Sequence, residues 1–404
     1  MQVACDSTRD YPMPGMDVNK EVVPMGDRVG IVAVAESTPA IAKENLMDAV
    51  YWVTKELLDK VGVEREEVGT IVTAASDVFH SGISCANSYY WEASGGFLKN
   101  ASRQDADSLF AFLYACMRIL SGHFETAMVV ALTKGSENPE NDTVTSLYAD
   151  PFYHRPLGIN ETTAAALQMR QYMEHYGISL EQCAMVTVKN LGNALYNPYA
   201  HVRKRVTVDE VLRSQPIADP LTAMQCAPKS DGVVAVLLAR EDKAKKLTDN
   251  PVWFRGYSSA MDTSTLGDRD LLNGMLSQVA RRAYAMAGIV DPSTEVDVAE
   301  ISEPYAFQEL LWCEQLGLCP EGGGGRLLDS GITGLHGRLP VNPSGGVLAT
   351  NAYVARGLYR IAEAYWQLTK RAGEHQVDKT VHTALAHSTH GFAGQSHTVV
   401  ILGD

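Results

Sequence analysis

The sequence predicts a layered α/β fold, on the evidence of three patterns. Short runs rich in β-branched residues alternate with longer segments that repeat apolar residues at helical spacing. The same order of strand and helix returns in the second half of the chain. Between these two parts the pattern loosens, and Pro, Asn and Tyr become frequent. Such an alternation is typical of helices that pack on the faces of a sheet.

The first half is expected to span residues 28–255, after an irregular lead-in at 1–27. It includes an inserted lobe at about 135–230, where the pattern loosens. The segment at 105–122 is apolar nearly all round, which predicts a buried helix. The other elements expected here are strands at 28–35, 68–76, 126–132 and 230–240, and helices at 43–61, 162–176 and 208–214.

The second half, expected at 256–404, repeats the scheme and suggests a duplication. A glycine-containing turn, NPSGG at 342–346, leads into a long helix that ends near residue 372. Two closing strands follow around a glycine-containing loop between 383 and 404. The remaining elements of this half are strands at 252–260 and 296–302 and helices at 270–288 and 306–317.

Composition excludes several classes of protein. The formal net charge is -14, which argues against a non-specific nucleic-acid binder, because such a protein needs clustered basic residues. No apolar run is long enough for a membrane span, and the N-terminus lacks the pattern of a signal peptide. The seven cysteines are scattered, without metal-ligand or disulfide spacing. We therefore expect a cytoplasmic protein that binds no metal and no nucleic acid.

Several short motifs occur together in this chain, namely Lys189–Asn190, Asn197–Pro198, Asp219–Pro220, Ser230–Asp231–Gly232 and NPSGG at 342–346. With these motifs the sequence resembles the thiolase superfamily, most closely its sterol-carrier-protein-type and steroid-degradation branch, which includes thiolase-like side-chain aldolases. The resemblance covers the chain from about Val29 to its C-terminus. It implies a five-layered αβαβα fold of two similar halves, with a loop domain over a coenzyme A site and assembly into a dimer or larger oligomer.

The position of the catalytic cysteine of a thiolase is occupied by another residue. A thiolase needs a thiolate at a buried helix N-terminus, where the helix dipole lowers its pKa. Aligned without gaps to the family's Cys-Ala-Ser-Gly helix, the segment at 105–122 has Asp105 at the cysteine position. Asp105 would serve as a base or nucleophile there, or Asp105 or Asp107 simply caps the helix. Cys116 lies well inside the helix, and Cys85 lies on a preceding loop.

Other catalytic positions of the family also differ here. The family's Asn-Glu-Ala-Phe block matches SEPYAF, so that Ser302 replaces the water-holding residue and Glu303 keeps the acid. The histidine that follows NPSGG in a thiolase is Ala352, and Tyr353 comes next. In the side-chain aldolases a tyrosine of this segment is thought to serve as acid or base, which makes Tyr353 the first catalytic candidate. The second tyrosine of those aldolases would match Ser302 and is absent.

The last loop carries two further candidates. The second thiolase cysteine matches Thr389, and the adjacent His390 has a side chain suited to acid–base chemistry near neutral pH. His390 is equally explained as a loop histidine that bonds the backbone. The backbone N–H of Gly391 would help to form an oxyanion hole, or the residue is a turn glycine.

No permanently bound cofactor is expected, and coenzyme A would enter as the thioester part of the substrate. Arg203, Lys204 and Arg205 form a basic cluster that would meet the phosphates of coenzyme A, or they form a solvated loop face. The glycine-containing turn with Ser344, Gly345 and Gly346 is the other expected coenzyme A contact. The segments SYYWEASGGF and TSLYADPFYH would line a pocket for a bulky or cyclic acyl group, or they form core or dimer contacts.

Three functions follow from these expectations. The first is a lyase that cleaves a β-hydroxyacyl-CoA by a retro-aldol reaction, using Tyr353, His390 and a backbone oxyanion hole without an acyl-cysteine. The second is an acyltransferase with a relocated nucleophile, Cys85. The third is a non-catalytic subunit of a heteromeric complex. The resemblance also implies a homodimer and a small partner protein with a zinc ribbon and an OB-fold. The acyl group and the direction of the reaction cannot be inferred from the sequence.

Overall fold

The computed structural model describes residues 28–39, 43–77, 90–138 and 140–404. The predicted lead-in at 1–27 and Cys85 lie outside these ranges. The strands of the two halves join into one nine-stranded mixed sheet. In spatial order its strands are β3 (Asn100–Gln104), β2 (Thr70–Ala74), β4 (Thr126–Lys134), β7 (Asp231–Arg240), β1 (Val29–Glu36), β8 (Val252–Met261), β11 (Ser396–Gly403), β10 (Thr383–His390) and β9 (Val298–Glu300).

The described helices fall into three groups by position. The first half contains α1 (Leu46–Asp59), α3 (Ser108–Leu120) and α8 (Glu241–Leu247). The lobe contains α4 (Asn141–Thr145), α5 (Glu161–Tyr176), α6 (Leu180–Ala194) and α7 (Val208–Leu212), with a short hairpin of β5 (Pro216–Ala218) and β6 (Leu221–Thr222). The second half contains α9 (Leu276–Ala287), α10 (Pro292–Glu295), α11 (Ala306–Gln315), α12 (Gly324–Asp329), α13 (Gly346–Ala349) and α14 (Arg356–Leu368).

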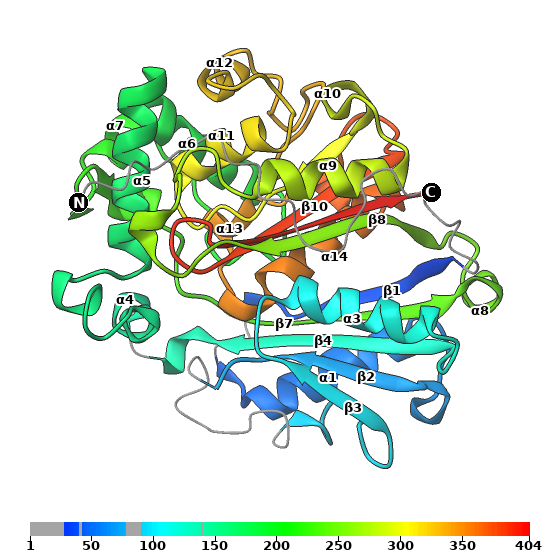
Figure 1. Ribbon diagram of the computed structural model, residues 1–404. Helices are drawn as coiled ribbons and strands as arrows, with labels where there is room; N and C mark the ends of the chain where they lie inside the picture. The colour runs from blue at the N-terminus through cyan, green and yellow to red at the C-terminus, as the bar shows by residue number, and fades with distance from the viewer. Residues whose placement is uncertain (1–27, 40–42, 78–89, 139) are drawn as a thin grey trace.

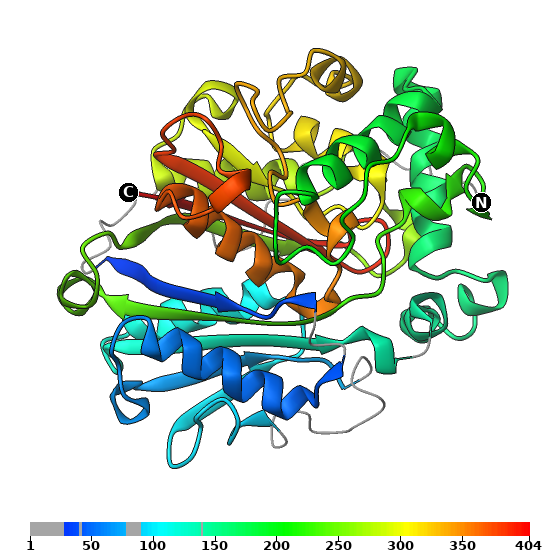
Figure 2. The same ribbon diagram turned by 180° about the vertical axis from the view of Figure 1, so that it is seen from behind.

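These elements stack in five layers, as Figure 1 and the reverse view in Figure 2 show. Helices α1 and α8 cover the outer face of the sheet part formed by β3, β2, β4, β7 and β1. Helices α3 and α14 lie between this part and the part formed by β8, β11, β10 and β9. Helices α9 and α11 cover the far side of the second part. The αβαβα arrangement is therefore the one expected from the resemblance.

Three hydrophobic clusters fill the spaces between the layers. The central cluster joins α3 and α14 to both parts of the sheet, and it includes Phe112, Tyr365 and Val400. Because α3 is enclosed by protein, it has apolar residues nearly all round, as the sequence predicted. The other two clusters lie under α1 and under α9 and α11. Burial of these apolar faces is the main force that holds the layers together.

The two parts of the sheet meet along a short seam. Strand β1 pairs with β8 only at Gly30 with Trp253 and at Ile31 with Val252, whereas β8 pairs with β11 as far as Met261. The boundary predicted at 255/256 thus falls inside β8, a strand that pairs along its length within the second half.

Along the sequence, the lobe is inserted between β4 and β7. It contains one long helix that the sequence analysis did not predict, α6. Its pattern is hard to read because several of its buried residues are polar. Asn190 donates hydrogen bonds to Glu303 and Glu309 at 3.0 and 2.8 Å, and Lys189 forms an ion pair with Glu309 at 2.8 Å. Buried polar groups of this kind are satisfied by tertiary contacts, so periodicity of apolar residues does not reveal the helix.

Gly256→Ala is expected to destabilise the fold. A Cβ at Gly256 would lie 2.4 Å from the carbonyl oxygen of Ala283, so that β8 and α9 would have to move apart. Such overpacking costs about 1–3 kcal/mol in the free energy of unfolding. Gly267→Ala is the matched control, because no atom lies within 4 Å of its added Cβ. Urea unfolding of both variants checks the expectation, and equal midpoints would contradict it.

Candidate functional site

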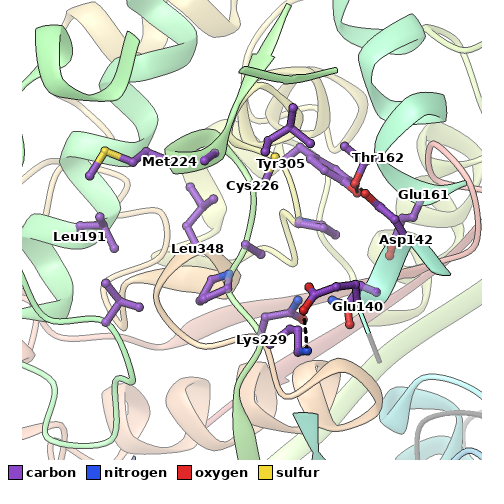
Figure 3. Close-up of a pocket in the computed structure, with 18 of the residues that line it drawn as sticks. Glu140, Asp142, Glu161, Thr162, Leu191, Met224, Cys226, Lys229, Tyr305 and Leu348 are labelled. Atoms are coloured by element: carbon purple, nitrogen blue, oxygen red, sulfur yellow. Dashed lines mark hydrogen bonds and ion pairs between the residues drawn. The ribbon is translucent and has the colours of Figure 1, made fainter. Parts of the chain in front are cut away.

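A cavity of about 400 Å³ lies between the lobe and the second half (Figure 3). A hydrogen-bonded row forms part of its wall: Tyr305 and Thr162 are 2.9 Å apart, and Thr162 donates to Asp142 at 2.6 Å. Lys229 pairs with Glu140 at 3.3 Å across another part of the wall. Further lining residues include Glu161, Leu191, Met224, Cys226, Lys204 and Leu348. The wall therefore combines apolar surface with several ionisable groups.

A second cavity, of about 190 Å³, adjoins the first at Glu161, which lines both. Four of its nine lining residues are aromatic, and the wall comes from the lobe, the segment between β8 and α9, the segment before α14, the end of β10 and the loop that follows it. The residues that form it with Glu161 are Thr145, Tyr148, Ser264, Tyr353, His390, Gly391, Phe392 and Gln395. Two of the predicted catalytic residues, Tyr353 and His390, are thus brought together here.

Glu161 is the first residue of α5, and Asn160 caps that helix by accepting a hydrogen bond from the backbone N–H of Thr163. The backbone N–H of Glu161 donates to the Thr145 hydroxyl at 3.1 Å, and the Glu161 side chain is buried. The Tyr353 hydroxyl hydrogen-bonds the Glu161 carboxylate. Burial raises the pKa of Glu161, and the guanidinium of Arg356 offsets part of this rise.

Arg356 is the first residue of α14, and its side chain is 1% exposed. One guanidinium nitrogen lies 3.6 Å from Glu161, and the guanidinium lies 4.5 Å from the centre of the Tyr353 ring. Its three side-chain nitrogens have no hydrogen-bond partner among the described residues. Burial opposes ionisation of Arg356, but Glu161, Tyr353 and Asp107 together outweigh it and raise the pKa of the guanidinium. The site therefore holds a buried positive charge that pairs with the Glu161 carboxylate behind the cavity walls.

His390 is the last residue of β10, and its ring centroid lies 6.2 Å from that of Tyr353 and 6.3 Å from that of Tyr148. Burial, with the charge of Arg356, lowers the pKa of His390 to about 4. The imidazole is thus neutral near pH 7. Burial raises the pKa of Tyr353 well above its usual value, so its hydroxyl stays protonated and donates to Glu161. Neutral donors and one carboxylate therefore face the smaller cavity.

The start of α3 shows which aspartate caps this helix. Asp107 is the N-cap and accepts from the backbone N–H of Leu109 at 2.9 Å, whereas Asp105 is exposed and pairs with Arg103 at 3.6 Å. Asp105 lines neither cavity. Burial raises the pKa of Asp107 to about 6.

The N-termini of α3 and α14 meet at this point. Ser108 accepts from the backbone N–H of Leu358 at 2.8 Å, and a Cβ on Gly357 would lie 2.1 Å from the Asp107 carboxylate. The positive ends of two helix dipoles therefore converge near Arg356.

Ser302 and Glu303 lie behind the larger cavity rather than in its wall. Both are fully buried, and Glu303 accepts hydrogen bonds from Asn190 at 3.0 Å and from the backbone N–H of Leu348 at 3.2 Å. Burial, with the nearby Glu309, raises the pKa of Glu303 to about 8. In the structure Glu303 binds the backbone of α13, and the next residues along the chain, Pro304 and Tyr305, reach the cavity.

The glycine-containing turn at 342–346 is held by contacts with buried charged residues. Ser344 donates to Glu300 at 2.8 Å and accepts from Arg360 at 3.0 Å. Gly345 and Gly346 have φ of 97° and 67°, and a Cβ on Gly346 would lie 2.0 Å from Glu303. The turn therefore requires glycine at both positions. None of the three residues of the expected coenzyme A contact lines either cavity.

The basic residues at 203–205 do not converge on one ligand. Lys204 borders the larger cavity, whereas Arg203 donates to the carbonyl of Leu195 at 2.8 Å and borders a different cavity. Arg205 is exposed and borders neither. Successive residues of an extended segment point to opposite sides, so these three side chains do not line one cavity, and their contact with coenzyme A stays a prediction.

One described cysteine lines the larger cavity, namely Cys226. Burial raises the pKa of its thiol to about 12, so it is not ionised near neutral pH. Cys116 is fully buried inside α3, as the sequence indicated. The sequence analysis did not single out Cys226, Glu161 or Arg356. Only the spacing of Arg356 from Tyr353, three residues along a helix start, offered a signal.

Comparison with known proteins identifies the family. Residues 258–404 match the family model described as thiolase C-terminal domain-like. The chain is 33% identical over 288 residues to the acetyl-CoA acetyltransferase of Methanothermobacter thermautotrophicus, which covers 70% of this chain and 74% of that protein. The chain belongs to the thiolase superfamily. Similarity to sterol carrier protein 2 of Oryctolagus cuniculus, 38% over 216 residues, assigns it to the sterol-carrier-protein-type branch; that match covers 52% of this chain and 39% of the relative.

Solved structures confirm the thiolase fold. The structure described as the Ltp2-ChsH2(DUF35) aldolase superposes with a TM-score of 0.79 at 21% sequence identity, covering 93% of this chain and 97% of that one. Human mitochondrial 3-ketoacyl-CoA thiolase superposes with a TM-score of 0.71 at 16% identity, covering 94% and 99%. Among the described residues of this thiolase-fold chain, no helix has the length and apolar character that a bilayer crossing requires.

Asp107→Asn is expected to make the stability of the protein less dependent on pH. The folded-state pKa of Asp107, about 6, exceeds its ordinary value of 3.8, so its contribution to stability is present at low pH and is lost as the pH rises through about 6. Asparagine keeps the capping oxygen but does not ionise.

Relative to the unsubstituted protein, the variant should therefore be more favoured at about pH 7.5 than at about pH 4, by about 2–3 kcal/mol in the free energy of unfolding. Urea titrations at both pH values measure this difference. An equal effect at the two pH values would contradict the proposed ionisation.

Proposed function

We propose that this chain is an acyl-CoA lyase that cleaves a β-hydroxyacyl-CoA by a retro-aldol reaction, without an acyl-cysteine intermediate. The observation that carries the proposal is the contact of Tyr353 with Glu161 at the junction of two cavities, next to buried Arg356. This arrangement supplies a base, a proton donor and a positive charge in one place. The reaction needs these three and no nucleophile.

The larger cavity is proposed to hold the pantetheine arm of the thioester. Apolar residues such as Leu191, Met224 and Leu348 would contact the arm, and Lys204 at the border would meet a phosphate. This use of the cavity replaces the expected cluster of three basic residues by one. Coenzyme A remains part of the substrate in this proposal, and no permanently bound cofactor is needed.

The proposed proton path begins at the β-hydroxyl of the substrate. Its proton passes through the Tyr353 hydroxyl to Glu161, whose raised pKa makes it a stronger base than an exposed glutamate. The bond between the α- and β-carbons then breaks, and its electrons form the enolate of the shorter thioester. Protonation of the α-carbon completes the products, an aldehyde or ketone and an acyl-CoA.

The enolate oxygen requires donors that are in place before charge develops. Neutral His390 and the backbone N–H of Gly391 border the smaller cavity, and the Arg356 nitrogens have no described hydrogen-bond partner. Helices α3 and α14 add the positive ends of their dipoles. We therefore assign these groups to stabilisation of the enolate.

The names of similar proteins support the broad class, an acyl-CoA enzyme, and not a particular reaction. Besides the acetyl-CoA acetyltransferase, the chain is 32% identical over 229 residues to the benzoylsuccinyl-CoA thiolase subunit BbsB of Thauera aromatica, covering 56% of this chain and 59% of that subunit. The chain is a thiolase-superfamily acyl-CoA enzyme.

We extend this proposal to assembly with a second copy of the chain and with a small zinc-ribbon and OB-fold protein, since β3 is an edge strand that offers backbone groups for pairing.

A second candidate function is acyl transfer, because Cys226 lines the larger cavity. Its pKa of about 12 disfavours the thiolate that such a reaction needs. Incubation with acetyl-CoA followed by mass spectrometry separates the candidates: a lyase leaves every cysteine unmodified, whereas acyl transfer adds an acetyl group to Cys226 or to Cys85.

Tyr353→Phe is expected to reduce the turnover of a β-hydroxyacyl-CoA about 100-fold or more, because the proton path loses its hydroxyl. Affinity for coenzyme A should persist, since Tyr353 does not line the larger cavity. The control is Tyr359→Phe, which removes a buried hydroxyl from α14, the helix that follows Tyr353, outside both cavities. Coupled assays of released acyl-CoA measure the rates, and full turnover by the Tyr353 variant would exclude this role.

The pH dependence of kcat/KM should report the ionisation of Glu161. Its pKa is raised above 4.5, so activity should fall as the pH drops through that raised value. His390, with a pKa of about 4, stays neutral in this range and does not produce the fall. Glu161→Gln should lose activity about 100-fold or more at every pH. Glu174→Gln, at the exposed end of α5, is the control and should retain the profile.

A further inference from the structure

The smaller cavity shows which kind of substrate fits the site. We propose that it receives the substituent on the β-carbon of the thioester and selects a single six-membered ring, preferably an aromatic one. This inference rests on the proposed retro-aldol function and adds the substrate class. The substrate would be a 3-aryl-3-hydroxyacyl-CoA, and the product that leaves the smaller cavity would be an aryl aldehyde or an aryl ketone.

The volume of the cavity sets the size of the group. At about 190 Å³ it is slightly larger than an apolar cavity of about 150 Å³, which holds a benzene molecule. One ring and the β-carbon substituents therefore fill it. A fused polycyclic skeleton has several times the volume of one ring and would not fit without movement of the wall.

The wall favours an aromatic group over an alkyl group. Tyr148, Tyr353 and Phe392 line the cavity, and the neutral imidazole of His390, which also lines it, has its ring centroid 6.3 Å from that of Tyr148 and 6.2 Å from that of Tyr353. Aromatic rings attract one another edge to face or offset, beyond the gain from buried area. A small alkyl group would leave much of this surface without contacts.

The inner wall is held in place from several directions. Phe392 packs with Ala149, Ala164 and Leu266 in a small buried cluster. The carbonyl of Phe392 accepts from Arg269 at 2.7 Å. The carbonyl of the next residue, Ala393, accepts a hydrogen bond from the Gln168 side chain at 3.2 Å. A loop fixed in this way cannot retreat to admit a larger group at low cost.

The outer wall is different, because Tyr148 is 48% exposed and lies on the solvent side of the lobe. This ring closes the cavity without being part of the core. Its removal should therefore enlarge the cavity and leave the fold intact.

The proposed reaction balances without any further reagent. The β-hydroxyl of 3-hydroxy-3-phenylpropionyl-CoA loses its proton, the bond between the α- and β-carbons breaks, and benzaldehyde forms. The electron pair of that bond passes to the thioester as an enolate. One proton on the α-carbon then gives acetyl-CoA, so the proton that left the hydroxyl is returned.

The test compares three thioesters with the full chain: 3-hydroxy-3-phenylpropionyl-CoA, 3-hydroxybutyryl-CoA and a β-hydroxyacyl-CoA whose β-carbon carries a four-ring steroid skeleton. We expect kcat/KM for the phenyl thioester to exceed that for the methyl thioester at least about tenfold, with no cleavage of the steroid thioester. In Tyr148→Ala the preference for phenyl over methyl should fall, and the steroid thioester should become a substrate. Phe152→Ala is the control, because Phe152 is an 80% exposed aromatic of the same lobe that lines neither cavity.

A binding measurement separates this inference from the proposed function. Calorimetry with Tyr353→Phe should show tighter binding of the phenyl than of the methyl thioester, at least about tenfold. Equal or weaker binding of the phenyl thioester, or cleavage of the steroid thioester by the unsubstituted protein, would overturn the inference. If none of the thioesters is cleaved, the retro-aldol function fails, and the calorimetric preference still decides what the cavity accepts.

Discussion

A buried arginine imposes the main constraint on this structure. Arg356 begins a helix that is enclosed between two parts of a sheet, and its charge must be compensated there because water cannot solvate it. Two carboxylates from other elements face it, Glu161 of the lobe and Asp107 before α3. The lobe, the first half and the second half are thus tied to one charge, which also brings the functional groups together.

Burial around this arginine sets the protonation states of the neighbouring groups. A guanidinium usually lowers the pKa of a nearby carboxylate, but burial raises the pKa of Glu161 and prevails. Burial lowers the pKa of His390, and the same guanidinium acts in the same direction, so the imidazole is neutral. Burial therefore shifts the pKa values of the carboxyl and the imidazole in opposite directions, whereas the positive charge of Arg356 lowers both.

Local patterns predicted the framework, and tertiary contacts determined the rest. The alternation of strands and helices, the buried helix at 105–122 and the insertion could be read from the chain because each depends on nearby residues. Glu161 could not be identified, since its partner is almost 200 positions away and no motif marks either. The arrangement of the basic residues at 203–205 could not be read from the chain for the opposite reason, because Arg203 and Lys204 are neighbours in sequence but border different cavities. Helix α6 was not predicted from the sequence because some of its buried residues are polar and contact buried acids.

The narrow seam between β1 and β8 has a consequence for how such a site evolves. Within the described sheet, only two residue pairs of β1 and β8 join its two parts, so the tilt between these parts is governed chiefly by side chains of the central helices. Substitutions in that layer would shift one half against the other while every strand keeps its own register. Cavities enclosed by both halves would in this way be widened or narrowed by mutations far from their walls. Related proteins with this fold would then accept different substrates while keeping the same catalytic residues.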